Sequence, residues 1–98
     1  MRFAFNSTKL TKLYTEEKGA RKYPPGVVEA FFEVMSVICN AKDERDLYVL
    51  KGLRYEKLKG ARGHQHSIRL NRQFRLIIER RHDEQGRYLL IIDIEDYH

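Results

Sequence analysis

The chain ends on three side chains that can do chemistry, Asp96, Tyr97 and His98, which follow the apolar run Tyr88–Ile92 closely. Histidine is suited to proton transfer because its ordinary pKa, about 6.5, lies near neutral pH. The end of a chain normally frays, but an apolar strand packed in a core would anchor this one up to the point where these residues begin. The sequence therefore predicts a histidine and an aspartate held at the end of a strand.

Positive charge is concentrated upstream of this group. Residues 51–81 contain ten lysines and arginines but only two acidic residues, a balance of +8, whereas the other 67 residues sum to −3. Dense positive charge attracts polyanions, above all the phosphates of nucleic acids. Phosphodiester chemistry requires both a group that moves protons and cations that stabilise the phosphate. The two features together predict phosphodiester chemistry on a nucleic acid.

Length and composition limit the other possibilities. We expect the 98 residues to form a single domain, residues 1–98, because so short a chain has room for one core. No segment approaches the roughly 20 apolar residues of a membrane span, and Met1–Phe5 is too short for a signal peptide. We therefore expect a cytoplasmic protein without a membrane partner. The single cysteine, Cys39, cannot form an internal disulfide and is predicted to be a buried structural thiol on an apolar helix face.

The first half of the chain has the pattern of helices. After a short strand at residues 2–5, Ser7 and Thr8 offer an N-cap for a helix to about Glu17, which Gly19 would end. The pair Pro24-Pro25 predicts the start of a second helix, reaching about Asn40. Apolar residues recur there at intervals of three and four, as expected of the main core helix: Val28, Phe31, Phe32, Met35, Ile38 and Cys39. Residues 42–48 are polar, with room for one short helical turn.

From residue 53 the apolar pattern changes to a period of two. It predicts strands at 53–58, 66–70, 74–79 and from Tyr88 onward, separated by a loop at 59–63 and turns at 71–73 and 83–86. Short turns imply an antiparallel sheet, and we expect an α+β fold with the two N-terminal helices packed on one face. The alternation predicts two groups of inward residues, namely Phe74, Leu76 and Ile78, and Tyr88, Leu90, Ile92 and Ile94. It predicts outward positions for Arg69, Arg75, Ile77, Glu79, Asp93, Glu95 and Tyr97.

That open face has two interpretations. Cations, a strand-end aspartate and the histidine could converge there on one functional surface. Alternatively, the face is simply solvated, since antiparallel sheets often expose one polar face to water. Alternation alone does not choose between the two.

Three segments together resemble the HigB branch of the RelE/ParE toxin superfamily. They are Tyr55–Gly60, which contains L-K-G; His66–Leu76, which reads H-S-I-R-L-N-R-Q-F-R-L; and Ile94–His98, which ends in D-Y-H. Members of that branch have such a loop, such a strand pair and such a terminus in the same order. The resemblance covers residues 53–98 closely and the helical half only in pattern. It implies a RelE-like fold.

The resemblance also implies a function. Such proteins are toxins of type II toxin–antitoxin systems that cut mRNA in the A site of the small (30S) ribosomal subunit, without a metal or other cofactor. The implied partners are the ribosome with its mRNA, and a cognate helix-turn-helix antitoxin of the HigA kind. Two alternatives of other classes remain: a non-catalytic toxin of the same fold directed at gyrase, like the ParE branch, and an inactive relative that only binds its antitoxin.

Site residues follow from matching positions. Lys59 matches the basic residue of the L-K-G loop, Arg75 the arginine of the fourth strand, and Asp96, Tyr97 and His98 the terminal catalytic group. Where the family often has a histidine two residues before the leucine of that loop, this chain has Glu56. The cations expected to bind RNA away from the cut are Arg54, Lys57, Arg62, Arg69 and Arg72.

These residue types suit cleavage of RNA through its own 2′-hydroxyl, which needs a base, cations for the phosphorane and an acid for the leaving 5′-oxygen. His98 is the expected acid or base, and its own α-carboxylate and Asp96 should favour the imidazolium form. Lys59 and Arg75 would stabilise the scissile phosphate, and Tyr97 would stack on a base or orient the sugar. Glu56 could be the base, but a carboxylate is a weak one unless burial raises its pKa.

Two other motifs invite interpretation. His64 and His66 could form a zinc site with His98, but no cysteine or carboxylate stands at ligand spacing, so we predict no metal. The run Arg80–His82 is predicted to lie at a turn as a solvated charge cluster, with contact to ribosomal RNA as the alternative.

Overall fold

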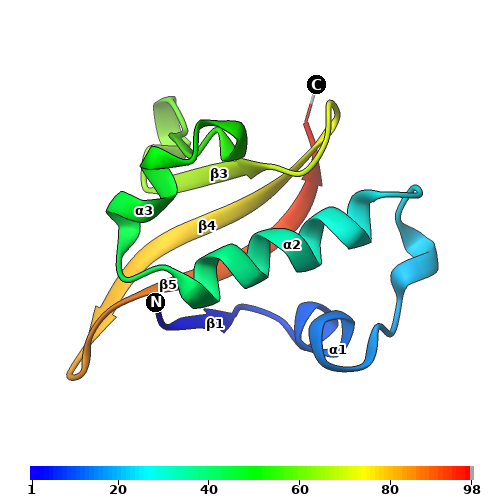
Figure 1. The fold of residues 1–98 in the computed structure, drawn as a ribbon, viewed down its shortest axis with the longest axis horizontal. Helices are drawn as coiled ribbons and strands as arrows, with labels where there is room; N and C mark the ends of the chain where they lie inside the picture. Colours follow the sequence, from blue (N-terminus) through cyan, green and yellow to red (C-terminus); the bar gives the residue numbers. More distant parts are fainter. Residues whose placement is uncertain (98) are drawn as a thin grey trace.

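The structure, a computed structural model, describes residues 1–97; His98, the terminal residue of the predicted site, lies outside the described residues. Those residues form one five-stranded sheet and three α-helices (Figure 1). The helices are α1 Thr8–Glu16, α2 Val27–Asn40 and α3 Glu44–Val49. The strands are β1 Phe3–Phe5, β2 Glu56–Lys57, β3 Gln65–Arg69, β4 Phe74–Asp83 and β5 Gly86–Asp96. Short 3₁₀ turns occur at Ala20–Lys22, Lys51–Leu53 and Gly60–Arg62.

The sheet has the strand order β1-β5-β4-β3-β2. Strands β2 to β5 are antiparallel, which confirms the expected meander and the α+β class. Strand β1 instead joins the free edge of β5 in parallel, with Phe3 opposite Leu89. The sheet is therefore mixed, and the two ends of the chain are paired by hydrogen bonds along the same edge.

The helices begin close to the predicted residues. The Ser7 side chain accepts a hydrogen bond from the Leu10 backbone N–H at 3.2 Å and caps α1, as predicted. Helix α1 ends at Glu16, close to the expected residue, and both Glu17 and Gly19 take the left-handed conformation after its last turn. Helix α2 packs across β4 and β5 and supplies most of the helical core (Figure 1). The polar segment after it contains the short helix α3 that its sequence allowed.

One expectation for α2 is wrong. Cys39 is exposed, whereas the preceding residue, Ile38, is completely buried. Successive helical residues are rotated by about 100°, so only one of these two neighbours faces the sheet. The core stripe of α2 consists of Val27, Phe31, Val34, Met35 and Ile38.

A β-bulge in β5 reverses the predicted alternation of that strand. Ile78 pairs with Ile91 but Ile77 pairs with Asp93, which leaves Ile92 as the extra residue. The core positions are consequently Leu89 and Ile91 before the bulge and Ile94 after it. The predicted inward face of Tyr88, Leu90, Ile92 and Ile94 is therefore correct only for the last of the four. Past the bulge, Asp93 and Glu95 lie on the face opposite the helices, as expected.

Two other strands differ in length from their predictions. Strand β4 continues to Asp83, so the run Arg80–His82 lies within a strand and not at a turn; the reversal is the two residues between Asp83 and Gly86. Strand β2 is only Glu56–Lys57, because Lys51–Leu53 forms a 3₁₀ turn and Arg54 then takes a left-handed conformation with φ of 48°. No helix within residues 1–97 is long and apolar enough to cross a membrane.

Candidate functional site

The face of the sheet opposite α2, here called the outer face, holds several of the predicted site residues, including Glu56, Arg75 and Tyr97. Strand register places Arg69, Arg75 and Glu95 in one row across it, and Ser67, Ile77 and Asp93 in the next. Glu56 of β2 lies beside Ser67 on the same face. The face is polar but not simply solvated, since Ile77 is completely buried there without belonging to the main core.

Arg75 lies at the centre of this face. Its guanidinium is 3.8 Å from a Glu56 carboxylate oxygen, and its Cζ lies 5.6 Å from the centre of the Tyr97 ring. The Arg75 side chain is only 21% exposed, so these neighbours restrict its orientation. A guanidinium held between a carboxylate and an aromatic face presents its remaining N–H groups in a fixed plane, which suits the binding of a phosphate. The structure thus brings together Glu56, Arg75 and Tyr97.

Arg62 has partners within the chain that the sequence did not predict. Its two terminal nitrogens donate to both carboxylate oxygens of Glu95 at 3.0 and 2.7 Å, and its Nε donates to Gln65 at 3.0 Å. The hydrogen bond to Glu95 raises the pKa of the Arg62 guanidinium. Because these bonds occupy the guanidinium, the structure gives Arg62 the role of fastening the turn Gly60–Arg62 to β5.

Lys59 immediately precedes that fastened turn. It has extended backbone geometry, with φ of −97°, and Gly60 then turns the chain with φ of 68°, where glycine avoids the steric cost of a side chain. Within residues 1–97, the Lys59 ammonium forms no ion pair, so its charge is available to a ligand. The Arg62–Glu95 pair therefore fixes the loop that carries Lys59 beside the end of β5.

The end of β5 is held by the turn before β4. The Tyr97 N–H donates to the Gln73 carbonyl at 2.6 Å, and the Gln73 amide donates to both Asp96 carboxylate oxygens at 3.1 and 3.0 Å. Alternation along β5 directs Asp96 to the side opposite Glu95 and Tyr97. The structure therefore separates Asp96 from Arg75 and gives its carboxylate a role in holding the strand end. The relation of His98 to these groups lies outside the described residues.

The remaining predicted RNA-binding cations are dispersed. Arg54 and Arg69 border one hollow next to Glu56. Arg69 is half-buried, and its Nε donates to the Asn71 carbonyl at 3.3 Å. Arg72 is exposed in the turn before β4. Lys57 alternates to the helix side of the sheet, opposite His66.

Comparison with known proteins shows the family. Residues 3–97 match the model of the HigB-like toxins, described as the RelE-like toxin of the type II toxin–antitoxin system HigB. The chain belongs to this family. It is 33% identical over 79 residues to Toxin HigB-1 of Vibrio cholerae serotype O1, covering 81% of this chain and 83% of that relative. The resemblance found in residues 53–98 is thereby confirmed.

Two solved structures share the fold of this HigB-like toxin. The YoeB/ParE toxin from Agrobacterium tumefaciens matches with a TM-score of 0.57 and 16% identity, over 100% of both chains. The YoeB–YefM complex from Staphylococcus aureus matches with a TM-score of 0.59 and 20% identity, over 100% of this chain and 97% of that one. At these identities the similarity shows the fold alone, and it agrees with the predicted RelE-like class.

On its helix side, the toxin contains a buried polar cluster around His66 that the sequence analysis missed. The His66 ring is 2% exposed and stacks on Tyr55, with ring centres 4.8 Å apart. Its Nε2 lies 3.3 Å from both the Tyr48 hydroxyl and an Arg80 nitrogen. Arg80 also pairs with Glu44 at 3.3 Å, and Glu44 accepts a hydrogen bond from the Tyr55 hydroxyl at 2.7 Å. Burial lowers the pKa of His66 and raises that of Tyr55.

The tautomer of His66 follows from its partners. Arginine can only donate hydrogen bonds, so Nε2 accepts and the neutral ring carries its proton on Nδ1. That Nδ1 is buried without a hydrogen-bond partner among residues 1–97. The sequence could have predicted this cluster from the alternation of β3 and β4, which puts His66 and Arg80 on the same face as Ile68 and Ile78. In the described part of the chain, no three potential metal-ligating side chains lie together, and His64 is instead 3.7 Å from Glu79.

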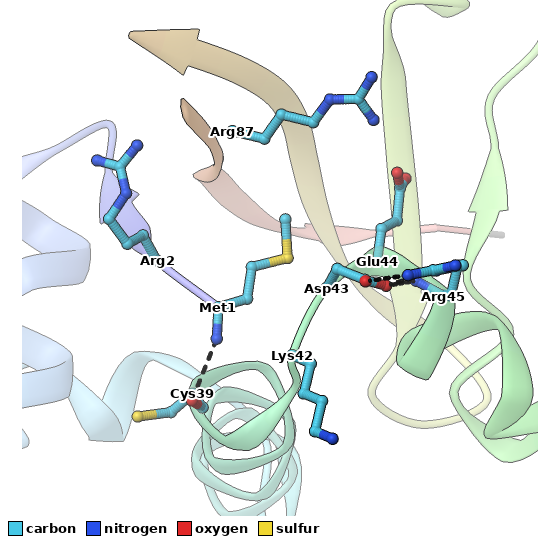
Figure 2. Close-up of a pocket in the computed structure, with 8 residues that line it drawn as sticks. All are labelled: Met1, Arg2, Cys39, Lys42, Asp43, Glu44, Arg45 and Arg87. Atoms are coloured by element: carbon cyan, nitrogen blue, oxygen red, sulfur yellow. Dashed lines mark hydrogen bonds and ion pairs between the residues drawn. The ribbon is translucent and has the colours of Figure 1, made fainter. Parts of the chain in front are cut away.

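Another hollow lies between the start of β1, the end of α2 and α3 (Figure 2). One pair of its charges is neutralised, because the Arg45 guanidinium bonds Asp43 at 2.8 Å and lowers the pKa of that carboxyl to about 2. Arg2 likewise pairs with Asp83 at 2.7 Å. None of the predicted site residues lines this hollow, so the outer face remains the candidate site of the toxin.

Proposed function

We propose that this toxin is a ribosome-dependent endoribonuclease that cleaves mRNA in the A site through attack of the RNA's own 2′-hydroxyl, without a metal. The observation that carries the proposal is the position of Arg75, held between Glu56 and Tyr97 on an open sheet face. Membership in the HigB-like family supports it. The fastened loop adds a second cation, Lys59, at the same end of the sheet.

The roles follow from the chemistry. A base takes the proton of the 2′-hydroxyl, the 2′-oxygen attacks phosphorus, and the 5′-oxygen leaves with a proton from an acid, which produces a 2′,3′-cyclic phosphate. We assign Glu56 as the base and His98 as the acid. Arg75 and Lys59 stabilise the added charge of the phosphorane, and Tyr97 stacks on a base or orients the sugar. Asp96 contributes to the terminal group by position: its carboxylate accepts hydrogen bonds from Gln73 and so holds the end of the strand in place.

Glu56 forms an ion pair on the outer face with Arg75. Its side chain is 60% exposed and its partner is Arg75, an arrangement that also describes an ordinary surface ion pair. Its place on the same face as Arg75 and Tyr97 supports the catalytic assignment.

We propose two partners for the toxin in the cytoplasm. One is the small ribosomal subunit with mRNA in its A site, bound by the excess positive charge of residues 51–81. The other is a cognate helix-turn-helix antitoxin of the HigA kind. Membership in a toxin family of type II toxin–antitoxin systems supports binding of an antitoxin partner.

Translation of a defined message, followed by primer extension, tests this function. Wild-type toxin should produce cuts at the A-site codon. DNA damage without such cuts would identify a gyrase-directed toxin, and neither outcome would identify a protein that only binds its antitoxin. Both results contradict the nuclease proposal.

Single-turnover cleavage separates the two groups of cations. Arg75→Ala and Lys59→Ala should each lower the rate at saturating toxin by about 10²-fold or more, the typical loss when one group that stabilises transition-state charge is removed. Arg72→Ala should weaken ribosome binding and reduce its salt dependence while leaving the saturated rate unchanged. Lys18→Ala, an exposed cation in the turn after α1, is the control for loss of one charge. An unchanged rate in Arg75→Ala would remove it from the site.

A further inference from the structure

A hollow of about 590 Å³ adjoins the candidate site on the β2 side of the sheet. It is lined by residues from the end of α3, the following 3₁₀ turn and the sheet, namely Tyr48, Leu50, Lys51, Arg54, Glu56 and Arg69. Because Glu56 and Arg69 belong both to this hollow and to the outer face, a strand of RNA crossing Arg75 would continue into it. Its volume falls within the range of small-ligand sites.

The aromatic wall of this hollow is Tyr48, which is fixed and exposed at once. Its ring packs edge-on against Tyr55, with centres 4.9 Å apart, and its hydroxyl lies 3.3 Å from the buried Nε2 of His66. The side chain is nevertheless 50% exposed, and the neighbouring Leu50 is 47% exposed. Large apolar groups held rigidly at a surface signal a binding function more strongly than mobile ones, because little conformational entropy is lost when a ligand stacks on them.

The charge of the hollow is positive. Lys51, Arg54 and Arg69 line it against one acid, Glu56, which is already paired with Arg75. Within residues 1–97, neither Lys51 nor Arg54 pairs with a carboxylate. Arg54 also has a left-handed backbone conformation, with φ of 48°, which costs less steric strain for glycine than for a residue with a side chain.

We propose that this hollow is a nucleotide subsite next to the cleavage site, in which Tyr48 stacks on a base of single-stranded RNA while Lys51 and Arg54 bind its phosphates. The inference rests on the proposed function and extends it to residues outside the L-K-G loop and the D-Y-H terminus. An aromatic platform beside a cationic groove is the arrangement by which proteins hold single strands, since every base has a face that stacks. An acidic segment of a partner protein is the alternative occupant, and the experiment tests it through binding of the purified antitoxin.

The test uses a fluorescein-labelled, fully 2′-O-methylated RNA hexanucleotide, which lacks the attacking hydroxyl and therefore binds without being cut. Fluorescence anisotropy measures its affinity for the full chain. Tyr48→Ala should weaken binding about tenfold, within the range typical of one lost base stack, and Tyr48→Phe should stay within twofold of wild type. Val49→Ala is the matched control, because Val49 is 74% exposed in the same helix but does not line the hollow.

The cations are tested by salt dependence. Lys51→Ala should reduce the slope of log affinity against log salt concentration by about 0.7, the contribution of one phosphate contact on a single strand. Lys18→Ala should leave that slope unchanged. Arg54→Gly should weaken RNA binding similarly without lowering the melting temperature, because glycine relieves the left-handed strain.

Hexanucleotides with one abasic position identify the stacked base. In wild type, one abasic position should weaken binding as much as Tyr48→Ala does, and in Tyr48→Ala the same position should have no further effect. Equal affinities of wild type and Tyr48→Ala would overturn the subsite. So would unchanged RNA affinity together with weaker binding of the purified antitoxin, which would make the hollow a protein-docking surface. If the wild-type toxin cuts at the A site but Tyr48→Ala binds RNA as well as wild type does, only the subsite is rejected. If Tyr48→Ala binds RNA more weakly but the wild-type toxin makes no A-site cuts, only the proposed cleavage is rejected.

Discussion

At the scale of single residues, the candidate site combines groups that act by charge with groups that move protons. Arg75 is oriented by Glu56 and Tyr97, and Lys59 is presented by a fastened loop. We propose that Glu56 and His98 transfer the protons, which makes these two positions the decisive ones to change.

We predict that His98→Ala, or deletion of His98, abolishes mRNA cleavage and growth inhibition while the fold remains intact. Among residues 1–97, Ile94 is the last core residue, so we expect the packing not to depend on the end of the chain. Loss of a general acid or base typically lowers a rate 10²- to 10⁴-fold. Primer extension measures the cleavage, and circular dichroism confirms the fold. Cleavage by the shortened chain at the wild-type rate would exclude His98 as the acid.

Glu56 gives a second prediction. If it is the base, Glu56→Gln should be nearly inactive, and Glu56→His should restore cleavage with the acidic limb of the pH–rate profile moved to about pH 6 to 7, near the ordinary histidine pKa. Single-turnover rates from pH 5 to 9 provide the measurement. A rate for Glu56→Gln within about twofold of wild type would leave Glu56 as a surface partner of Arg75, worth less than about 1 kcal/mol of stability.

At the scale of elements, the site depends on how three segments without regular structure are fastened to the sheet. The Gly60–Arg62 turn is tied to β5 by the Arg62–Glu95 pair, and the 71–73 turn is tied to the end of β5 by Gln73. Segment 50–55 is joined to the sheet through Tyr55 and the His66 cluster. Loops positioned by a rigid scaffold are where functional residues usually occur, and here the positioning bonds are polar and specific.

The Arg62–Glu95 pair gives the prediction at this scale. Both side chains are about one-third exposed or more, so Arg62→Ala should cost less than about 1 kcal/mol of stability. The same change should lower the single-turnover rate by roughly 10- to 100-fold, because Lys59 loses its fixed position. Arg62→Lys should not restore the rate, since lysine cannot form the paired bonds of the guanidinium.

A double-mutant cycle provides the control. Arg62→Ala combined with Glu95→Gln should be no slower than either single variant, because both remove the same interaction. Additive losses of rate would mean that Arg62 instead contacts RNA on its own, as its charge alone suggested.

At the scale of the whole molecule, the core lies between the helices and one face of the sheet, and the outer face is the opposite face of the same sheet. The His66 cluster is the polar exception within that layer, and it joins α3 to β3 and β4. Burial opposes protonation of His66 most strongly and the charge of Arg80 comes next; Glu44 favours protonation less strongly than Arg80 opposes it, and Lys57 has the smallest effect, also against protonation. Burial and these cations together keep the ring neutral in the folded protein and lower its pKa.

The stability of the toxin should therefore fall as the pH drops below about 6.5, the ordinary histidine pKa that applies to the unfolded chain. In that range the unfolded chain binds a proton that the folded one does not, which costs up to about 1.4 kcal/mol per pH unit. Urea unfolding at pH 7.5, 6.5 and 5.5 should show a smaller decline for His66→Phe than for wild type. His64→Gln, which changes an exposed histidine, should keep the wild-type slope. Parallel curves for wild type and His66→Phe would contradict this assignment.

The sequence by itself determined the parts that depend on local pattern. The pair Pro24-Pro25 and the spacing of apolar residues predicted α2, and strict alternation predicted β3, β4 and the outward positions of Arg75 and Tyr97. The Ser7 cap was predicted for the same reason, because a capping side chain bonds to a backbone N–H within the next few residues. The L-K-G loop, the segment His66–Leu76 and the D-Y-H terminus together indicated the family, because all three stand in the order and spacing of its members.

The tertiary structure alone decided the features that join distant residues. The parallel pairing of β1 with β5, the bulge at Ile92 and the Arg62–Glu95 pair each depend on partners remote in sequence, 33 residues apart in the last case. The bulge reversed the predicted inward residues of β5, since one extra residue inverts a period of two. The Arg62–Glu95 pair was not predicted because local sequence carries the charge of Arg62 but not the position of Glu95.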